Sequence, residues 1–236
     1  MSGTRVFGQE FEGTTLRHEL FHDGSGTARP GVILFPTVMG VTDLERGFAE
    51  RLVGRGYSAV VADLYGRRYT PAERDAAVAA MQALRGDRAA LRERLLAVLG
   101  AAIEQDEIDG KRVAAIGFCF GGQNALDLAR SGTNIAGVAS FHGLFDPPGL
   151  PPLPIKAKVA AYHGWDDPLV RPEAVVALGK ELTEAGADWQ VHAYGHVAHG
   201  FTNPGATGAI PGVRFDSQAA RRAWAACDQF LAECFE

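Results

Sequence analysis

Cysteine is scarce in this chain, with only 3 in 236 residues. That count is too low for a disulfide framework, so the small secreted scaffolds that disulfides hold together are excluded. Cys227 and Cys234 fall on one expected helix with their Cα atoms roughly 10 Å apart, which is farther than a disulfide spans. Cys119 lies in a different part of the chain. Reduced cysteines fit a reducing compartment, and we expect a cytoplasmic protein.

Long apolar runs and an excess of positive charge are also missing. No segment reaches the roughly 18 apolar residues that a membrane-spanning helix needs, and no apolar run of the signal-peptide type follows Met1. The 23 Lys and Arg residues stand against 28 Asp and Glu residues, which gives a formal net charge of -5 at pH 7. Charges of both signs are mixed along the chain, unlike the basic patches that bind nucleic acid. We expect neither a membrane nor a nucleic-acid partner.

A linker between domains is missing as well. No stretch changes composition sharply, and no internal repeat is present. The 47% hydrophobic and 22% charged residues are ordinary for a globular protein. We therefore predict a single domain over residues 1–236, with enough chain to bury a large core.

Strand-type apolar runs alternate with helical patterns along most of the chain. This alternation predicts an α/β fold with a mainly parallel, doubly wound sheet and helices on both faces. An N-terminal hairpin is expected to precede the alternating part, turning at about Gly13. The expected strands are 6–11, 15–22, 31–35, 58–62, 113–116, 135–141, 158–163 and 189–194, and the expected helices are 42–54, 71–84, 88–105, 123–130, 173–185 and 217–235.

The stretch Gly-Phe-Cys-Phe-Gly-Gly at 117–122 joins a strand to a helix. It is typical of a nucleophile elbow, a strained turn that needs small neighbours such as Gly117 and Gly121 around the nucleophile. The helix N-terminus would favour the thiolate of Cys119. An inert buried cysteine is the alternative. A nucleotide-binding turn is excluded because the second glycine position is Cys119 and no Gly-Lys-Ser/Thr follows.

Two further residues complete a possible catalytic set. A thiol nucleophile needs a base, and the base needs an acceptor that orients it. Cys119 follows one expected strand, Asp167 follows a later one and His199 follows the last, in the order nucleophile, acid, histidine. Because active sites of such sheets lie at the carboxyl ends of the strands, we expect these three side chains to meet there.

Four motifs resemble the dienelactone hydrolase family over about residues 31–235: the elbow, His-Gly-Trp-Asp-Asp-Pro, Ala-His-Gly-Phe and Ala-Asp-Leu-Tyr-Gly-Arg. The resemblance implies an α/β-hydrolase fold and hydrolysis of a carboxylic ester or lactone by Cys119, His199 and Asp167, with no cofactor and no metal. Asp167 matches the family acid better than Asp166 does, because a valine, Val170, follows it three places on.

The resemblance also implies oxyanion and substrate contacts. The backbone N–H groups of Val38 and Phe120 match the family's oxyanion donors. The sequence departs from the family at Thr37, where dienelactone hydrolases proper carry a glutamate, and at Asn203, where they carry the second of two arginines that hold the substrate carboxylate. Arg67 matches the first arginine. These departures predict a broad substrate range with little demand for a free carboxylate.

Because Thr37 is neutral, it offers no repulsion to a thiolate. The helix N-terminus and a protonated His199 would both favour the anion. We therefore expect Cys119 to rest as a thiolate paired with the His199 imidazolium.

The remaining candidates have structural alternatives. His142 ends a strand near the expected site and is either a pocket residue or a structural histidine. Tyr65, Trp165 and Phe201 are either pocket walls or core aromatics. The histidines at 192, 196 and 199 also suggest zinc, but metal ligands at such spacing usually share one helix face, and Gly195 breaks this segment.

We expect a monomer or homodimer that acts on a small-molecule ester or lactone. A thioesterase or general short-chain esterase without a lactone role is one alternative. A catalytically silent relative that binds an acyl ligand or senses oxidants through Cys119 is another. The complete set of Cys119, Asp167 and His199 argues against a silent protein, since a binding protein needs no triad.

Overall fold

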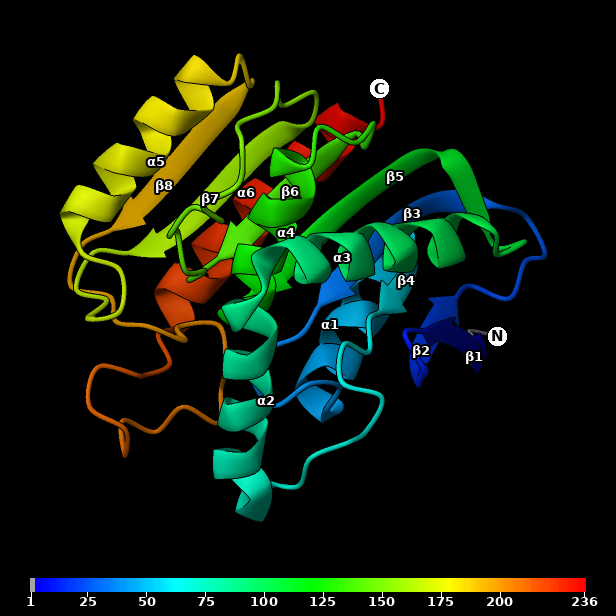
Figure 1. Cartoon of the computed structure of the whole chain (residues 1–236), viewed down its shortest axis with the longest axis horizontal. Helices are drawn as coiled ribbons and strands as arrows, with labels where there is room; N and C mark the ends of the chain where they lie inside the picture. Colours follow the sequence, from blue (N-terminus) through cyan, green and yellow to red (C-terminus); the bar gives the residue numbers. More distant parts are fainter. Residues whose placement is uncertain (1–2) are drawn as a thin grey trace. The chain divides into compact units, whose positions relative to one another are not determined.

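The structure is a computed structural model that describes residues 3–236. Its strands β1, β2, β4 and β3 are hydrogen-bonded neighbours in that order, and so are β6, β7 and β8 (Figure 1). The predicted α/β class is confirmed. The strands are β1 (Gly3–Phe11), β2 (Thr14–His22), β3 (Arg29–Phe35), β4 (Ser58–Val61), β5 (Ile108–Phe118), β6 (Gly137–Phe141), β7 (Lys158–Gly164) and β8 (Trp189–Tyr194). The helices are α1 (Asp43–Val53), α2 (Arg74–Gly86), α3 (Arg88–Ile103), α4 (Phe120–Arg130), α5 (Pro172–Glu184) and α6 (Ser217–Cys234).

The chain forms two compact units, Met1–Ala115 and Ile116–Glu236, each described by itself. In the first unit, β1 and β2 form the predicted hairpin, in which Phe11 pairs with Thr14. Glu12 and Gly13 form the turn at φ values of 47° and 75°. Two positive φ values match the type I′ turn that suits a two-residue hairpin. β2 pairs antiparallel with β4, and β4 pairs parallel with β3.

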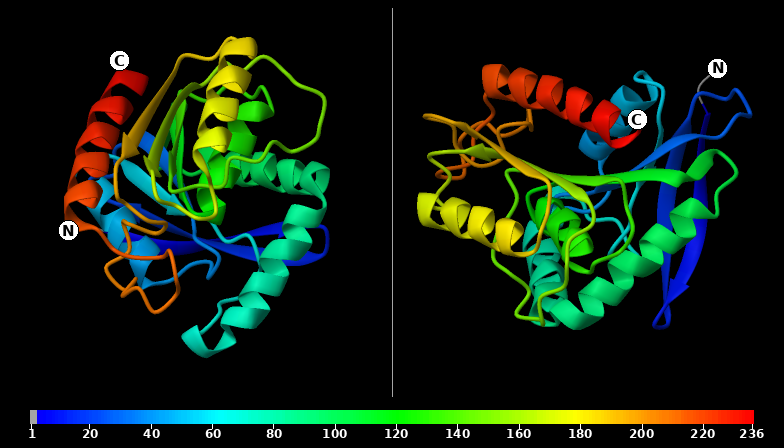
Figure 2. Two further views of the ribbon diagram at one scale, coloured as in Figure 1. Left: turned by 90° about the vertical axis from the view of Figure 1, so that its left-hand side faces the viewer. Right: turned by 90° about the horizontal axis from the view of Figure 1, so that it is seen from above.

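The central strands of the first unit are covered on both faces. Val32 to Phe35 and Ala59 to Val61 have no exposed surface, as expected of parallel strands between layers of helices. Figure 2 shows α1 on one face of these strands and α3 on the other. The hydrophobic runs of the sequence thus became the buried strands that position the loops after them.

Several element boundaries differ from the sequence predictions. A 3₁₀ turn, Pro71–Glu73, precedes α2, so Pro71 does not open the α-helix itself. The Glu73 carboxylate accepts hydrogen bonds from Thr70 N and Oγ1 at 2.9 and 3.0 Å, which stabilises this separate turn. β5 begins at Ile108, earlier than predicted, because residues 109–112 join the strand although they are polar and largely exposed.

In the second unit, β6 pairs parallel with β7, and β7 pairs parallel with β8. Figure 2 shows α4 and α5 on one face of these strands and α6 on the other. The buried face of α6 includes Trp224, Cys227, Phe230 and Leu231. The carboxyl ends of β5, β6 and β7 lead directly into Cys119, His142 and the loop before α5, where the predicted site residues begin.

Arg130 at the end of α4 is buried and uses all five of its N–H groups. Its Nε and Nη2 each donate to the Glu181 carboxylate at 2.7 Å, and Nη1 donates to Asp127 Oδ1 at 3.1 Å. The carbonyl oxygens of Phe145 and Asp146 accept the remaining N–H groups at 3.0 and 3.3 Å. A buried guanidinium needs such complete pairing. Arg130 therefore ties α4 to α5 and to the segment after β6.

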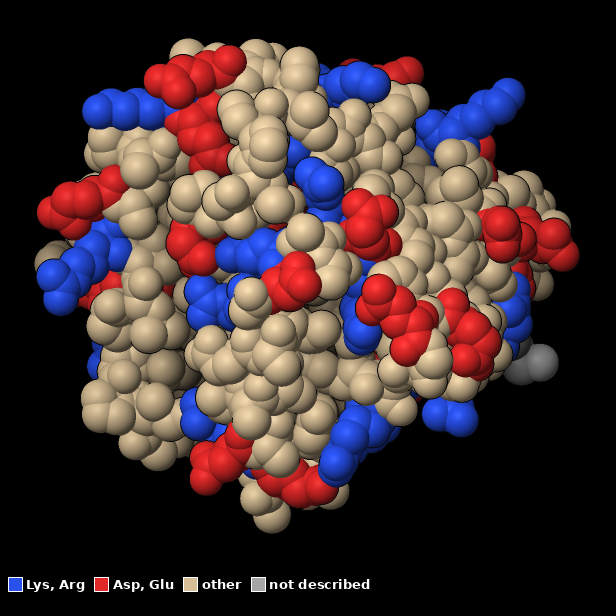
Figure 3. All heavy atoms as spheres, in the orientation of Figure 1, with Lys and Arg blue, Asp and Glu red and all other residues tan. Residues whose placement is uncertain are grey.

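Cys119, Cys227 and Cys234 form no disulfide bond with one another. Within residues 3–236, no helix combines the length and the apolarity required to cross a bilayer. Acidic and basic side chains are interspersed on the face that Figure 3 shows, without a continuous basic area.

Candidate active site

Cys119 occupies a strained turn between β5 and α4. Its φ and ψ are 56° and -116°, a backbone conformation that residues other than glycine rarely adopt. Its N–H donates to the Phe141 carbonyl oxygen at 3.0 Å, and its own carbonyl accepts from Gln123 N at 3.2 Å. The predicted elbow is thus present, with the thiol at the N-terminus of α4.

Glycines make this turn possible. A Cβ on Gly117 would lie 1.9 Å from the Gly121 carbonyl oxygen, closer than any real contact. A Cβ on Gly122 would lie 2.6 Å from Ser140 Oγ and 2.7 Å from Gly143 Cα. The turn therefore needs glycine at 117, and the close packing of α4 on the end of β6 needs glycine at 122.

Asp167 and His199 form a buried pair. His199 Nδ1 lies 2.7 Å from Asp167 Oδ2, while Leu169 N donates to the other carboxylate oxygen at 2.8 Å. Asp166 has a different partner, because its Oδ2 lies 3.8 Å from Nδ1 of the exposed His196. Of the two neighbouring aspartates, only Asp167 is bonded to His199.

The backbone around His199 is held on both sides. His199 N donates to the Gly212 carbonyl oxygen at 2.9 Å, and Arg214 N donates to the His199 carbonyl oxygen at 3.0 Å. A Cβ on Gly164, at the end of β7, would lie 2.5 Å from the Val197 carbonyl oxygen. The long loop after β8 is therefore packed closely on the end of β7.

Charge favours a thiolate at Cys119. Burial opposes ionisation of the thiol, but attraction to His199 and the Phe120 N–H outweigh it and lower the pKa of Cys119. Burial likewise opposes protonation of His199, yet the Cys119 charge and the Asp167 hydrogen bond raise the pKa of His199. The two shifts have opposite signs, as in a thiolate–imidazolium pair.

The first unit carries Thr37 and Val38, and Glu45 holds their loop. Oε1 of the buried Glu45 accepts from Thr37 N and Oγ1 at 3.2 and 3.1 Å, and Oε2 accepts from Thr42 N at 3.0 Å and from the Thr42 hydroxyl. Burial raises the pKa of Glu45 against these hydrogen bonds. Glu45 is also the capping-box residue at the start of α1. Its reach back to Thr37 depends on tertiary structure.

Tyr65 and Arg67 also belong to the first unit. The Tyr65 hydroxyl donates to the Val38 carbonyl oxygen at 3.1 Å. Arg67 Nη2 lies 2.5 Å from Glu73 Oε1, and its guanidinium lies 4.5 Å from the centre of the Tyr69 ring. Arg67 is therefore already paired with a carboxylate of its own chain.

The other predicted pocket residues have varied surroundings. Phe201 is fully buried and packs edge-on against His142 and Tyr194, which fits the core alternative. Trp165 is 42% exposed. The side-chain oxygen of Asn203 accepts from Gly205 N at 2.8 Å and so shapes its own turn.

His192 and His196, the other two histidines considered as zinc ligands, do not cluster with His199. His192 Nε2 bonds Gln190 Oε1 at 2.8 Å, and His196 is exposed. Between residues 3 and 236, no group of three or more His, Cys, Asp or Glu side chains could hold a metal ion.

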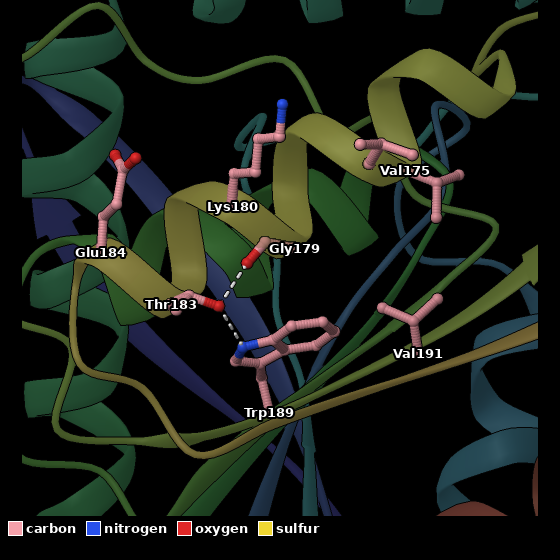
Figure 4. Close-up of a pocket in the computed structure, with 8 residues that line it drawn as sticks. Val175, Gly179, Lys180, Thr183, Glu184, Trp189 and Val191 are labelled. Carbon is pink, nitrogen blue, oxygen red and sulfur yellow. Dashed lines mark hydrogen bonds between the residues drawn. The ribbon is translucent and has the colours of Figure 1, made fainter.

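A groove of about 530 Å³ lies between α5 and β8 (Figure 4). Trp189 Nε1 donates to Thr183 Oγ1 at 3.1 Å, and the Thr183 hydroxyl donates to the Gly179 carbonyl at 2.8 Å. None of the predicted site residues lines it. The lining residues are Val175, Val176, Gly179, Lys180, Thr183, Glu184, Trp189 and Val191.

Comparisons with known proteins agree with the fold. The model of the Dienelactone hydrolase family matches residues 20–235. Carboxymethylenebutenolidase 1 of Cupriavidus pinatubonensis is 31% identical over 151 residues, 61% of this chain and 64% of that protein. The solved structure of m3DLH is 37% identical, with a TM-score of 0.90, over 100% of this chain and 99% of that one. P91, a dienelactone hydrolase-like promiscuous phosphotriesterase from metagenomic libraries, is 35% identical, with a TM-score of 0.89, over 100% and 99%.

Proposed function

We propose that this chain, which belongs to the dienelactone hydrolase family and is a hydrolase acting on lactones or esters, works through a Cys119–His199–Asp167 triad and an acyl-enzyme. The observation that carries the proposal is the buried 2.7 Å bond between His199 Nδ1 and Asp167 Oδ2. This bond leaves Nε2 of His199 for the nucleophile. The thiol lies at the N-terminus of α4 with a lowered pKa.

Acylation begins with attack of the Cys119 thiolate on the carbonyl carbon, forming a C–S bond. The Phe120 N–H, which already interacts with the sulfur, is suited to stabilise the developing oxyanion, and the Val38 N–H is the second donor that the resemblance predicts. The C–O bond then breaks, and the His199 imidazolium gives its proton to the leaving oxygen. With a lactone, that oxygen stays attached to the acyl chain.

Deacylation uses water and reverses these roles. Neutral His199 removes a proton from water, and the hydroxide attacks the thioester carbon. The C–S bond breaks, the carboxylic acid leaves, and the thiolate and imidazolium return. Asp167 fixes the tautomer of His199 through both steps. No cofactor enters this scheme.

The test is hydrolysis of p-nitrophenyl acetate and of a simple lactone by Cys119→Ala. Turnover should disappear while the melting temperature stays near that of the original protein, and mass spectrometry of the original protein should detect an acyl group on Cys119. Cys234→Ala is the matched control, because it removes a thiol far along α6, and it should keep its turnover. Full activity of Cys119→Ala would refute the triad.

Phosphotriester hydrolysis is a second candidate activity. P91 carries this activity in its name, and its similarity spans 100% of this chain at 35% identity. Cys119 would attack phosphorus, an aryloxide would leave, and water would release the phosphodiester from the sulfur. Measurable turnover of an aryl dialkyl phosphate that Cys119→Ala lacks would support it, whereas stoichiometric inactivation without turnover would exclude it.

Thioester hydrolysis and a non-catalytic role remain the alternatives predicted from the sequence. A matched panel of lactones, oxygen esters and thioesters separates the first from lactone hydrolysis by kcat/KM. Absence of turnover on the whole panel would favour an acyl-binding or oxidant-sensing role. A cytoplasmic location and a monomer or homodimer are part of the proposal, and cell fractionation and light scattering test them.

A further inference from the structure

His142 combines burial, backbone strain and a position beside His199. It follows the last residue of β6, and only 1% of it is exposed. Its φ is 37°, in the left-handed region that costs a residue other than glycine on the order of 1 kcal/mol or more. Its N–H donates to the Tyr162 carbonyl oxygen of β7 at 2.8 Å. The sheet therefore holds the His142 backbone in an unfavourable conformation that fixes the direction of its side chain.

The side chain contacts the segment that begins with His199. His142 Nε2 lies 2.8 Å from Thr202 Oγ1, within hydrogen-bond distance. The centres of the His142 and His199 rings are 5.1 Å apart, with the planes at 67°. Phe201 packs on His142 in the same edge-to-face manner at 5.2 Å and 80°. His142 thus contacts three of the four residues from His199 to Thr202.

The other bonds of His199 do not fully fix the orientation of its ring. Gly212 and Arg214 hold its backbone, and Asp167 holds Nδ1. A ring bonded through one nitrogen can still tilt about that bond, and a tilt would move Nε2 away from the nucleophile. An edge-to-face neighbour on a rigid strand end restricts that tilt.

We propose that His142 is a positioning residue for His199, acting through its hydrogen bond to Thr202 and its edge-to-face ring contact. The inference rests on the proposed triad and adds a residue to it that does not touch the reacting atoms. It assigns His142 to the support of the catalytic histidine, and not to the wall of the substrate pocket.

The charge state of His142 suits this role. Burial first, and then the charges of His199 and His163, lower the pKa of His142 well below its usual value. His142 therefore stays neutral at neutral pH and contacts the imidazolium of His199 without repelling it. A lysine or arginine here would disfavour the His199 cation.

The experiment uses Thr202→Val, which keeps the shape of the side chain and removes the hydroxyl, and His142→Phe, which keeps a ring. Each is measured for kcat, for KM and for the pH dependence of Cys119 alkylation by iodoacetamide. Thr202→Val should lower kcat about tenfold, the scale of one hydrogen bond, with KM within about twofold. The alkylation profile should move to higher pH, since a misplaced imidazolium stabilises the thiolate less.

Two further variants serve as references. Thr202→Ser restores the hydroxyl and should recover most of the lost turnover. Thr183→Val removes a hydroxyl that also donates to a carbonyl but lies on α5 away from the triad, and it should leave kcat unchanged. His142→Phe should lower kcat about as much as Thr202→Val does. The loss of kcat should be larger if the Phe ring cannot reproduce the packing of the imidazole.

Three outcomes would overturn the inference. A kcat and an alkylation profile like those of the original protein in Thr202→Val would show that the bond is only structural. A raised KM with unchanged kcat would make His142 a substrate contact. A Thr202→Ser variant as slow as Thr202→Val would exclude the hydroxyl. If His142→Phe does not fold, Thr202→Val decides. Because these results are judged beside Cys119→Ala, failure of the positioning role is distinguishable from failure of the triad.

Discussion

Two turns of the second unit, the corners that follow β5 and β6, each hold a residue other than glycine at a positive φ. Cys119 follows β5 at 56°, and His142 follows β6 at 37°. The two corners are joined, because Cys119 N donates to the carbonyl oxygen of Phe141, the residue before His142. Glycines around them pack closely, with a Cβ on Gly143 reaching to 2.9 Å from Gly122 C.

The strained backbone at the two corners directs two different kinds of side chain. At Cys119 it directs a side chain that has a nucleophile's chemistry and a lowered pKa. At His142 it directs a neutral ring against the residues that carry the base. Backbone strain at adjacent strand ends can therefore position a reacting group and the support of its partner. The predictions below test how far these two roles are separate.

The largest change in kcat is expected when Asp167, the acid of the proposed triad, is substituted. Asp167→Asn should lower kcat by about 10³–10⁴-fold, because His199 loses the acceptor that sets its tautomer and orientation. Asp166→Asn is the matched control and should change kcat by less than about threefold. Steady-state kinetics on p-nitrophenyl acetate measure both. The reverse ranking of the two variants would contradict the choice of Asp167.

Substitution of a glycine at each corner shows how much each turn contributes to the free energy of unfolding. Gly117→Ala should lower the free energy of unfolding by about 3 kcal/mol or more, since its Cβ would meet a backbone oxygen at 1.9 Å. Gly143→Ala should lower it less, because its nearest obstacle, at 2.1 Å, is the Ser140 hydroxyl. The double variant Ser140→Ala, Gly143→Ala should recover part of that loss. Urea unfolding measures all three, and a larger loss for Gly143→Ala would reverse the comparison.

Alkylation compares Cys119 with the other thiols. Its lowered pKa predicts carboxymethylation or carbamidomethylation well below pH 8.5, the range of an ordinary thiol. Burial raises the pKa of Cys234 to about 12, so that thiol should stay unreacted. His199→Ala should shift the Cys119 profile to higher pH. A profile near pH 8.5 in the original protein would show that no resting ion pair exists.

The smallest effect concerns stability against acid. Burial lowers the pKa of His142 and of His163, so below about pH 6.5 the unfolded chain binds more protons at these sites than the folded one. Their contribution is present above that pH and is lost as the pH falls. His142→Phe should reduce the loss of unfolding free energy between pH 7 and pH 5, by on the order of 1 kcal/mol.

Short-range patterns accounted for much of the fold and for the identity of the triad candidates. Apolar runs predicted the buried strands because a parallel strand covered on both faces has few polar side chains. Gly117 marked the elbow because a Cβ at that position would collide with the Gly121 carbonyl oxygen. The start of β5 at Ile108 was missed because polar residues 109–112 continue the strand through backbone hydrogen bonds, which apolar periodicity does not report.

The order of residue types along the chain was enough to predict the α/β class and the succession of Cys119, Asp167 and His199 after the strands. The family resemblance already favoured Asp167 over Asp166, and the structure shows the bond itself, with Asp167 on His199 and Asp166 near His196. The bond between His142 and Thr202, sixty positions apart in the chain, is visible in the tertiary structure alone. The tertiary structure also showed that Glu45 reaches back to Thr37. Local propensity acts over a few residues, whereas these contacts depend on where separate loops meet after the strands have paired. No pattern along the chain encodes that meeting directly.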